Sequence, residues 1–79
     1  MTALNKTDSR LVALREVSEG KISYDPRTGT YSDENGTVSG ARRRTFAELR
    51  SNGAIEVGGT SVHRVTLTTA GSDLVSAWS

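Results

Sequence analysis

The stretch ARRRTFAELRSN (residues 41–52) decides the fold, together with the two segments that follow it. Ser39-Gly40 precedes this stretch and Gly53 follows it, and such residues are typical of the two ends of a helix. Placed at 100° per residue, Phe46 and Leu49 lie on one side of that helix. The opposite side carries basic and small residues: Arg43, Arg44, Ala47, Arg50 and Ser51. The sequence therefore predicts a helix with an apolar inner side and a basic outer side.

The segment after this helix predicts a hairpin and then a last helix. Residues 54–57 and 62–67 are rich in apolar and β-branched residues, and Gly58-Gly59-Thr60-Ser61 lies between them as a turn. In Leu67-Thr68-Thr69-Ala70-Gly71, a threonine can cap the helix that follows. Apolar residues recur on that helix at helical spacing: Ala70, Leu74, Ala77 and Trp78.

The N-terminal segment predicts another helix. Thr7-Asp8-Ser9 offers hydroxyl and carboxylate groups for an N-cap, and Gly20 can take the left-handed conformation that ends many helices. Leu11, Leu14 and Val17 recur between these two ends at helical spacing, so the helix has one apolar side.

Residues 21–40 have a different character and predict a β-meander. Short strands are expected on both sides of DPRTG (residues 25–29), which has the composition of a turn. Asn35-Gly36 is suited to a tight type I′ connection to a third strand. Tyr24 and Tyr31 are expected to face each other across the first turn, where they serve either packing or an exposed binding surface.

The composition limits the class of protein. A chain of 79 residues forms one domain, and without cysteine it has neither a disulfide framework nor a thiolate metal site. No apolar run approaches the roughly 18 residues that span a bilayer, and the N-terminal residues lack the apolar core of a signal peptide. We therefore expect a single domain, residues 1–79, that is cytoplasmic and has no membrane partner.

Residues suited to catalysis or metal binding are scarce. His63 is the only histidine, and it lies in the predicted hairpin, where a structural or solvent-facing role is expected. No histidine or carboxylate set has the spacing of a metal site, and Gly58-Gly59 lacks the lysine of a phosphate-binding loop. The sequence predicts a protein that is not an enzyme and that binds no cofactor or metal.

Positive charge is concentrated in the middle of the chain. Residues 41–64 hold five arginines and two glutamates, whereas residues 1–40 hold five basic and six acidic residues. Arg42, Arg43 and Arg44 stand at the start of the central helix, where the helix dipole favours an anion. Arg42 is expected to lay its stem along the edge of the core. The other arginines indicate an anionic partner, while an ordinary solvated basic surface and an acidic protein partner remain open.

Taken in order, these segments resemble a winged-helix domain, and more closely the short proteins of unknown function common in actinobacteria and their phages. The resemblance rests on residues 11–21, 44–56 and 65–71, and it covers nearly the whole chain. The middle block is similar to the exit from a recognition helix into a wing, and the last block to the entry into the closing helix. The resemblance implies a small α+β winged-helix-like domain with the order helix, β-meander, helix, β-hairpin wing and helix. In this domain residues 21–40 replace the short helix that normally precedes the recognition helix.

The resemblance and the basic helix together predict a non-enzymatic regulator that binds double-stranded DNA. The helix residues expected to face the major groove are Arg43, Arg44, Ala47, Arg50 and Ser51. The wing residues expected near the backbone are Thr60, Ser61 and Arg64. A homodimer through the last helix, with Leu74 and Trp78 at the seam, is expected to double these contacts.

A protein-interaction module on the same scaffold is the alternative, for instance a phage or accessory protein that binds a host factor. Residues 21–40 depart most from a DNA-binding winged helix, and exposed turns commonly carry binding residues. The residues predicted for this surface are Tyr24, Arg27, Tyr31 and Asp33.

Overall fold

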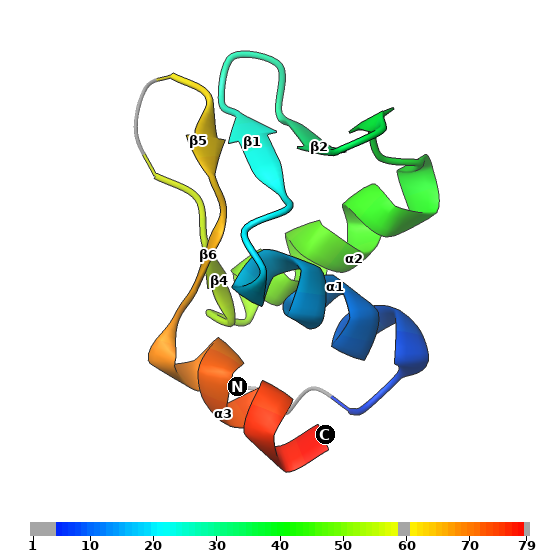
Figure 1. Cartoon of the computed structure of the whole chain (residues 1–79), viewed down its shortest axis with the longest axis vertical. Helices are drawn as coiled ribbons and strands as arrows, with labels where there is room; N and C mark the ends of the chain where they lie inside the picture. Colours follow the sequence, from blue (N-terminus) through cyan, green and yellow to red (C-terminus); the bar gives the residue numbers. More distant parts are fainter. Residues whose placement is uncertain (1–4, 59–60, 79) are drawn as a thin grey trace.

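The computed structural model describes residues 5–58 and 61–78, so Gly59 and Thr60 of the predicted wing tip lie outside the described residues. In the described part, three helices and short antiparallel strands alternate along the chain (Figure 1). The helices are α1 (Asp8–Ser18), α2 (Gly40–Ser51) and α3 (Thr69–Trp78). The strands are β1 (Ser23–Asp25), β2 (Thr30–Asp33), β3 (Gly36–Thr37), β4 (Ile55–Glu56), β5 (His63–Arg64) and β6 (Thr66–Leu67). This order of elements confirms the predicted α+β class.

Local capping groups fix the ends of the helices. The Thr7 hydroxyl accepts a hydrogen bond from the Arg10 N–H at 3.1 Å at the start of α1. The Ser39 hydroxyl accepts one from the Arg42 N–H at 3.4 Å at the start of α2. Gly53, with φ 74°, follows α2 in the left-handed region that glycine adopts without strain. Both ends of α2 therefore lie within one residue of the prediction.

The turn between β2 and β3 differs from the prediction. Asp33 pairs with Gly36, so Gly36 lies in the strand and Asn35 is the last residue of the turn. A type I′ turn needs positive φ at both turn residues, but among the described residues only glycines have positive φ. The Asp33 carboxylate instead accepts a hydrogen bond from the Asn35 N–H at 2.8 Å, and this contact shapes the turn.

The predicted hairpin wing divides between two partner strands. At its base β4 pairs with β6, with Ile55 opposite Leu67. Farther out, β5 pairs with β1, which gives a four-stranded sheet in the order β3-β2-β1-β5. The chain changes partner at Val65, which is buried and whose N–H donates to the Ile22 carbonyl at 2.9 Å. The predicted wing therefore does not consist of two continuous paired strands, because burial of Val65 against Ile22 places β5 next to β1.

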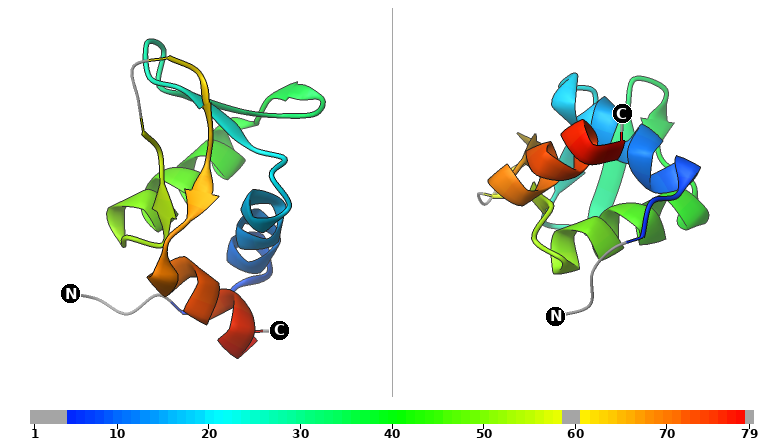
Figure 2. Two further views of the ribbon diagram at one scale, coloured as in Figure 1. Left: turned by 60° about the vertical axis from the view of Figure 1, so that its left-hand side comes forward. Right: turned by 90° about the horizontal axis from the view of Figure 1, so that it is seen from below.

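The core lies between α1, α2 and the strands, and α3 crosses the end of the molecule opposite the β1–β2 turn (Figure 2). Its buried members are Ala13, Leu14, Val17, Ile22, Tyr31, Val38, Phe46, Leu49, Ala54, Ile55 and Val65. Leu74 and Trp78 of α3 are partly buried against this core. The side chains expected at a dimer seam therefore pack against the core of their own chain. A homodimer through them stays a prediction.

Candidate nucleic-acid interface

The outer side of α2 is exposed, as predicted, and lines a hollow of about 570 Å³. The helix residues of this hollow are Arg43, Arg44, Ala47, Arg50 and Ser51, and its other wall is formed by Tyr24, Gly29 and Tyr31 of the β1–β2 hairpin. All five predicted helix residues are therefore together on one surface. The hairpin wall was not predicted, because the local sequence does not reveal that the hairpin packs beside α2.

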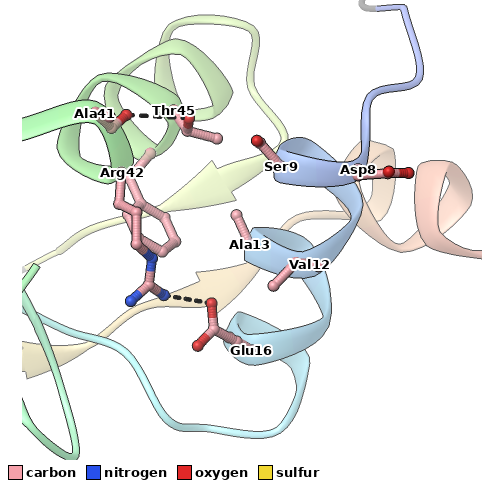
Figure 3. Close-up of a pocket in the computed structure, with 9 residues that line it drawn as sticks. Asp8, Ser9, Val12, Ala13, Glu16, Ala41, Arg42 and Thr45 are labelled. Atoms are coloured by element: carbon pink, nitrogen blue, oxygen red, sulfur yellow. Dashed lines mark hydrogen bonds and ion pairs between the residues drawn. The ribbon is translucent and has the colours of Figure 1, made fainter. Parts of the chain in front are cut away.

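Arg42 is directed away from this surface and joins α2 to the rest of the fold. Its Nη1 donates to Oδ2 of Asp33 at 2.7 Å, and its Nη2 donates to Oε1 of Glu16 (Figure 3). Its Cζ lies 5.8 Å from the centroid of the Phe46 ring. Two carboxylates and an aromatic ring therefore hold the first of the three successive arginines, as its expected place at the core edge implies. Within the described residues, no carboxylate pairs with the next two arginines.

We expect Asp33→Asn to destabilise the protein at neutral pH, and the loss to shrink as the pH falls. The pKa of the Asp33 carboxyl is lowered, chiefly by the hydrogen bond from Arg42 and then by the Asn35 N–H. A lowered folded-state pKa stabilises the fold above the pKa of the unfolded carboxyl, about 4, and this contribution disappears as the pH falls through the lower folded value. The side chain of Arg42 is 38% exposed, so solvent screens the pair and the expected effect is small.

Urea unfolding of the wild-type and Asp33→Asn proteins, measured from neutral to strongly acidic pH, checks this expectation. The two unfolding midpoints should converge in acid. The pKa of Glu48 is also lowered, chiefly by a hydrogen bond from Arg10, but this group titrates in both proteins and cancels in the comparison. A difference between the midpoints that stays constant with pH would contradict the role assigned to the Asp33 carboxylate.

A column of aromatic rings connects Arg42 to the outer side of α2. The Phe46 and Tyr31 centroids are 5.2 Å apart, and the Tyr31 and Tyr24 centroids are 4.8 Å apart. At the far end, Cζ of Arg50 lies 5.5 Å from the Tyr24 centroid, and its Nη1 donates to the Tyr24 hydroxyl at 3.4 Å. Arg42 and Arg50 of α2 therefore each contact one end of this aromatic column.

The surface predicted for a protein partner is not exposed as a whole. Tyr31 is only 3% exposed because it stacks on Phe46, and this corrects its expected place on an exposed turn. Burial raises the pKa of the Tyr31 phenol, and the nearby Arg50 opposes that rise. Asp33 is engaged by Arg42, as described above. Of the other two residues, Arg27 is exposed in the β1–β2 turn and Tyr24 is half-buried.

In β5, the residue that lies on the same face of the sheet as Tyr24 is not the one predicted to face the partner. Residues directly opposite each other in an antiparallel pair share a face of the sheet, and successive residues alternate. His63 is opposite Tyr24, so it shares the Tyr24 face, whereas Arg64 is opposite Ser23 on the other face. The exposed Ser61 lies near His63, with its Oγ 3.5 Å from Nδ1. Arg64 therefore lies away from the arginines of α2. His63 lies on the same side as Tyr24 and those arginines.

Arg64 instead packs near the end of α1. A Cβ placed on Gly20 would lie 3.2 Å from its Cδ, so the side chain covers the glycine that follows α1. The faces on which His63 and Arg64 lie were not predictable from the sequence, because they depend on the pairing of β5 with β1. Thr60, the remaining wing residue expected at the interface, lies outside the described residues.

The described residues contain neither the side-chain cluster of a metal site nor a membrane-spanning helix. No group of three histidine, aspartate or glutamate side chains there is arranged to hold a metal ion. None of the helices there has the length and apolar character needed to cross a membrane. Comparisons with protein-family models, curated proteins and solved structures found no significant match. Any functional assignment therefore depends on the residues and geometry of this chain.

Proposed function

We propose that this protein is a non-enzymatic regulator that binds double-stranded DNA through α2, on a winged-helix-like domain. The observation that carries the proposal is the exposed outer side of α2, where three arginines surround the small residues Ala47 and Ser51. Within the described residues these arginines have no carboxylate partner, whereas other arginines of the chain form ion pairs. Such a surface favours a partner with closely spaced negative charges.

The dimensions of α2 support this proposal. The helix has 12 residues, and at 1.5 Å per residue this is a length of about 18 Å. The major groove of DNA is about 12 Å wide and admits a helix of this kind. Small side chains at positions 47 and 51 permit close approach to the base edges. Gly29 of the β1–β2 turn lines the hollow, whereas the exposed Arg27 of the same turn pairs with Asp25 at 3.6 Å, so within the described residues the unpaired cations nearest to a bound phosphate are those of α2.

A salt titration of duplex binding tests the proposal. We expect Arg43→Ala/Arg44→Ala to weaken binding and to reduce the slope of log K against log salt by roughly two units, since each phosphate contact contributes about 0.9. Lys6→Ala/Arg15→Ala is the matched control, because it removes the same charge from exposed positions outside α2. Its slope should stay close to that of the wild type. Equal losses of affinity and of slope in the two double variants would mean that the effect arises from net charge alone. If the wild type bound no duplex at low salt, the DNA-binding function would be excluded.

A protein-interaction module is a second candidate, and one feature favours it. A groove of about 310 Å³ lies between α1 and α2, with Ala13 and Phe46 among its lining residues (Figure 3). Val12 also lines this groove and is 53% exposed, so it offers apolar surface to a partner. A wild-type protein that binds no duplex at low salt would make this candidate the better one.

A further inference from the structure

The three arginines on the outer side of α2 differ in how they are held. The side chains of Arg43 and Arg44 have no hydrogen-bond or ion-pair partner in the described part of the chain. Arg50, in contrast, stacks over the Tyr24 ring at 5.5 Å and donates from Nη1 to its hydroxyl at 3.4 Å. The Tyr24 ring is itself fixed by its contact with the buried Tyr31. One guanidinium is therefore oriented before any ligand binds, and two are not.

This difference decides what each arginine is suited to recognise. Phosphate attraction is long-range and tolerates a mobile cation, whereas recognition of the guanine O6 and N7 atoms requires a planar guanidinium in a defined orientation. The guanidinium of Arg50 has five N–H donors, and its contacts with the Tyr24 and Tyr31 hydroxyls leave donors for a bidentate contact. A side chain that is already ordered also loses less conformational entropy on binding.

We propose that Tyr24 is a positioning residue that holds Arg50 for a guanine base edge, while Arg43 and Arg44 supply the phosphate contacts. This inference rests on the proposed DNA-binding function. It adds that the site reads guanine at one base pair and that the β1–β2 hairpin acts on that readout through Arg50. The carboxylates of the chain do not compete for this guanidinium, since none pairs with Arg50 within the described residues.

Selection from a randomised duplex pool, followed by salt titrations on the selected duplex, tests the division of roles. We expect the wild type to select guanine at one position. Tyr24→Leu, which removes the ring and the hydroxyl, should lower that preference roughly tenfold, and Arg50→Lys should do the same, because a good bidentate contact discriminates by about one order of magnitude. Tyr24→Phe keeps the ring and should lose roughly threefold. The salt slope should stay close to the wild-type value in all three variants, while Arg43→Ala/Arg44→Ala should lower the slope and keep the preference for guanine.

Two controls keep the outcome interpretable. Thermal unfolding identifies any variant that does not fold, and Tyr24→Phe and Arg50→Lys then carry the test if Tyr24→Leu is lost. In the NMR spectrum, the Arg50 δ protons should show a ring-current shift in the wild type and in Tyr24→Phe, and this shift should disappear in Tyr24→Leu. A folded Tyr24→Leu protein that keeps the wild-type guanine preference would overturn the inference. Salt-dependent wild-type binding without base preference would overturn it and leave the DNA-binding function standing, whereas no duplex binding would overturn both.

Discussion

Replacing Gly71 by alanine should lower the free energy of unfolding by about 3 kcal/mol, because the new methyl group has no space. A Cβ on Gly71 would overlap the Ala54 carbonyl oxygen and lie 2.9 Å from its carbonyl carbon. The obstacle is backbone, so no side-chain rotation relieves it. Thr68 also holds the start of α3 against the α2–β4 connection. Its N–H donates to the Ala54 carbonyl at 3.1 Å, and its hydroxyl donates to the Gly53 carbonyl. Relief of the clash therefore requires α3 to move away from these contacts.

Gly40→Ala is the matched control for this variant. Gly40 also lies in a helix without positive φ, but no atom is within 4 Å of a Cβ placed there. The change should be within about 0.5 kcal/mol of the wild type or slightly stabilising. Urea unfolding of the three proteins measures both effects. Similar stabilities of Gly71→Ala and Gly40→Ala would mean that α3 does not pack against the α2–β4 connection as described.

Phe46→Ala should be still more damaging, with an expected loss of about 4 kcal/mol. Phe46 has no exposed surface, stacks on Tyr31 and lies under Arg42, so its removal leaves a buried cavity at the Arg42 end of the aromatic column. A small domain has a total stability of only about 5–15 kcal/mol, so a large part of the population should unfold at moderate urea concentrations.

Val12→Ala provides a comparison on the neighbouring helix. It also removes apolar atoms, but Val12 is 53% exposed, so the expected loss is below about 1 kcal/mol. Phe46→Leu keeps most of the volume and should cost roughly 1.5 kcal/mol. Unfolding midpoints of Phe46→Ala and Val12→Ala that coincide would be inconsistent with Phe46 as the centre of the core.

Features set by local chemistry were predictable from the sequence. Ser39 and Gly53 mark the ends of α2 because a hydroxyl cap and a left-handed glycine act within a few residues of the helix. The spacing of Phe46 and Leu49 likewise determines which side of α2 is buried, and hence that Arg50 and its basic neighbours are exposed. The helix half of the candidate site therefore follows from the sequence.

Features set by contacts distant in the sequence were not predictable in this way. The partner of β5 is β1, about forty positions earlier, and this pairing decides that His63 rather than Arg64 shares a face with Tyr24. Similarly, the fixed orientation of Arg50 depends on the Tyr24 ring, which packs on Tyr31. An isolated turn or helix contains no information about such pairings, because they depend on how the elements pack in three dimensions.

The aromatic column also provides an internal optical probe. Both tyrosines of the sequence belong to it, with ring centroids 4.8 Å apart, whereas the single tryptophan, Trp78, lies in α3. Transitions of rings this close couple, so near-ultraviolet circular dichroism in the tyrosine band reports on the surroundings of Arg50. Tryptophan fluorescence reports separately on α3. Tryptophan fluorescence and tyrosine circular dichroism therefore follow the two ends of the molecule without an attached dye, while a ligand is added or the chain is unfolded.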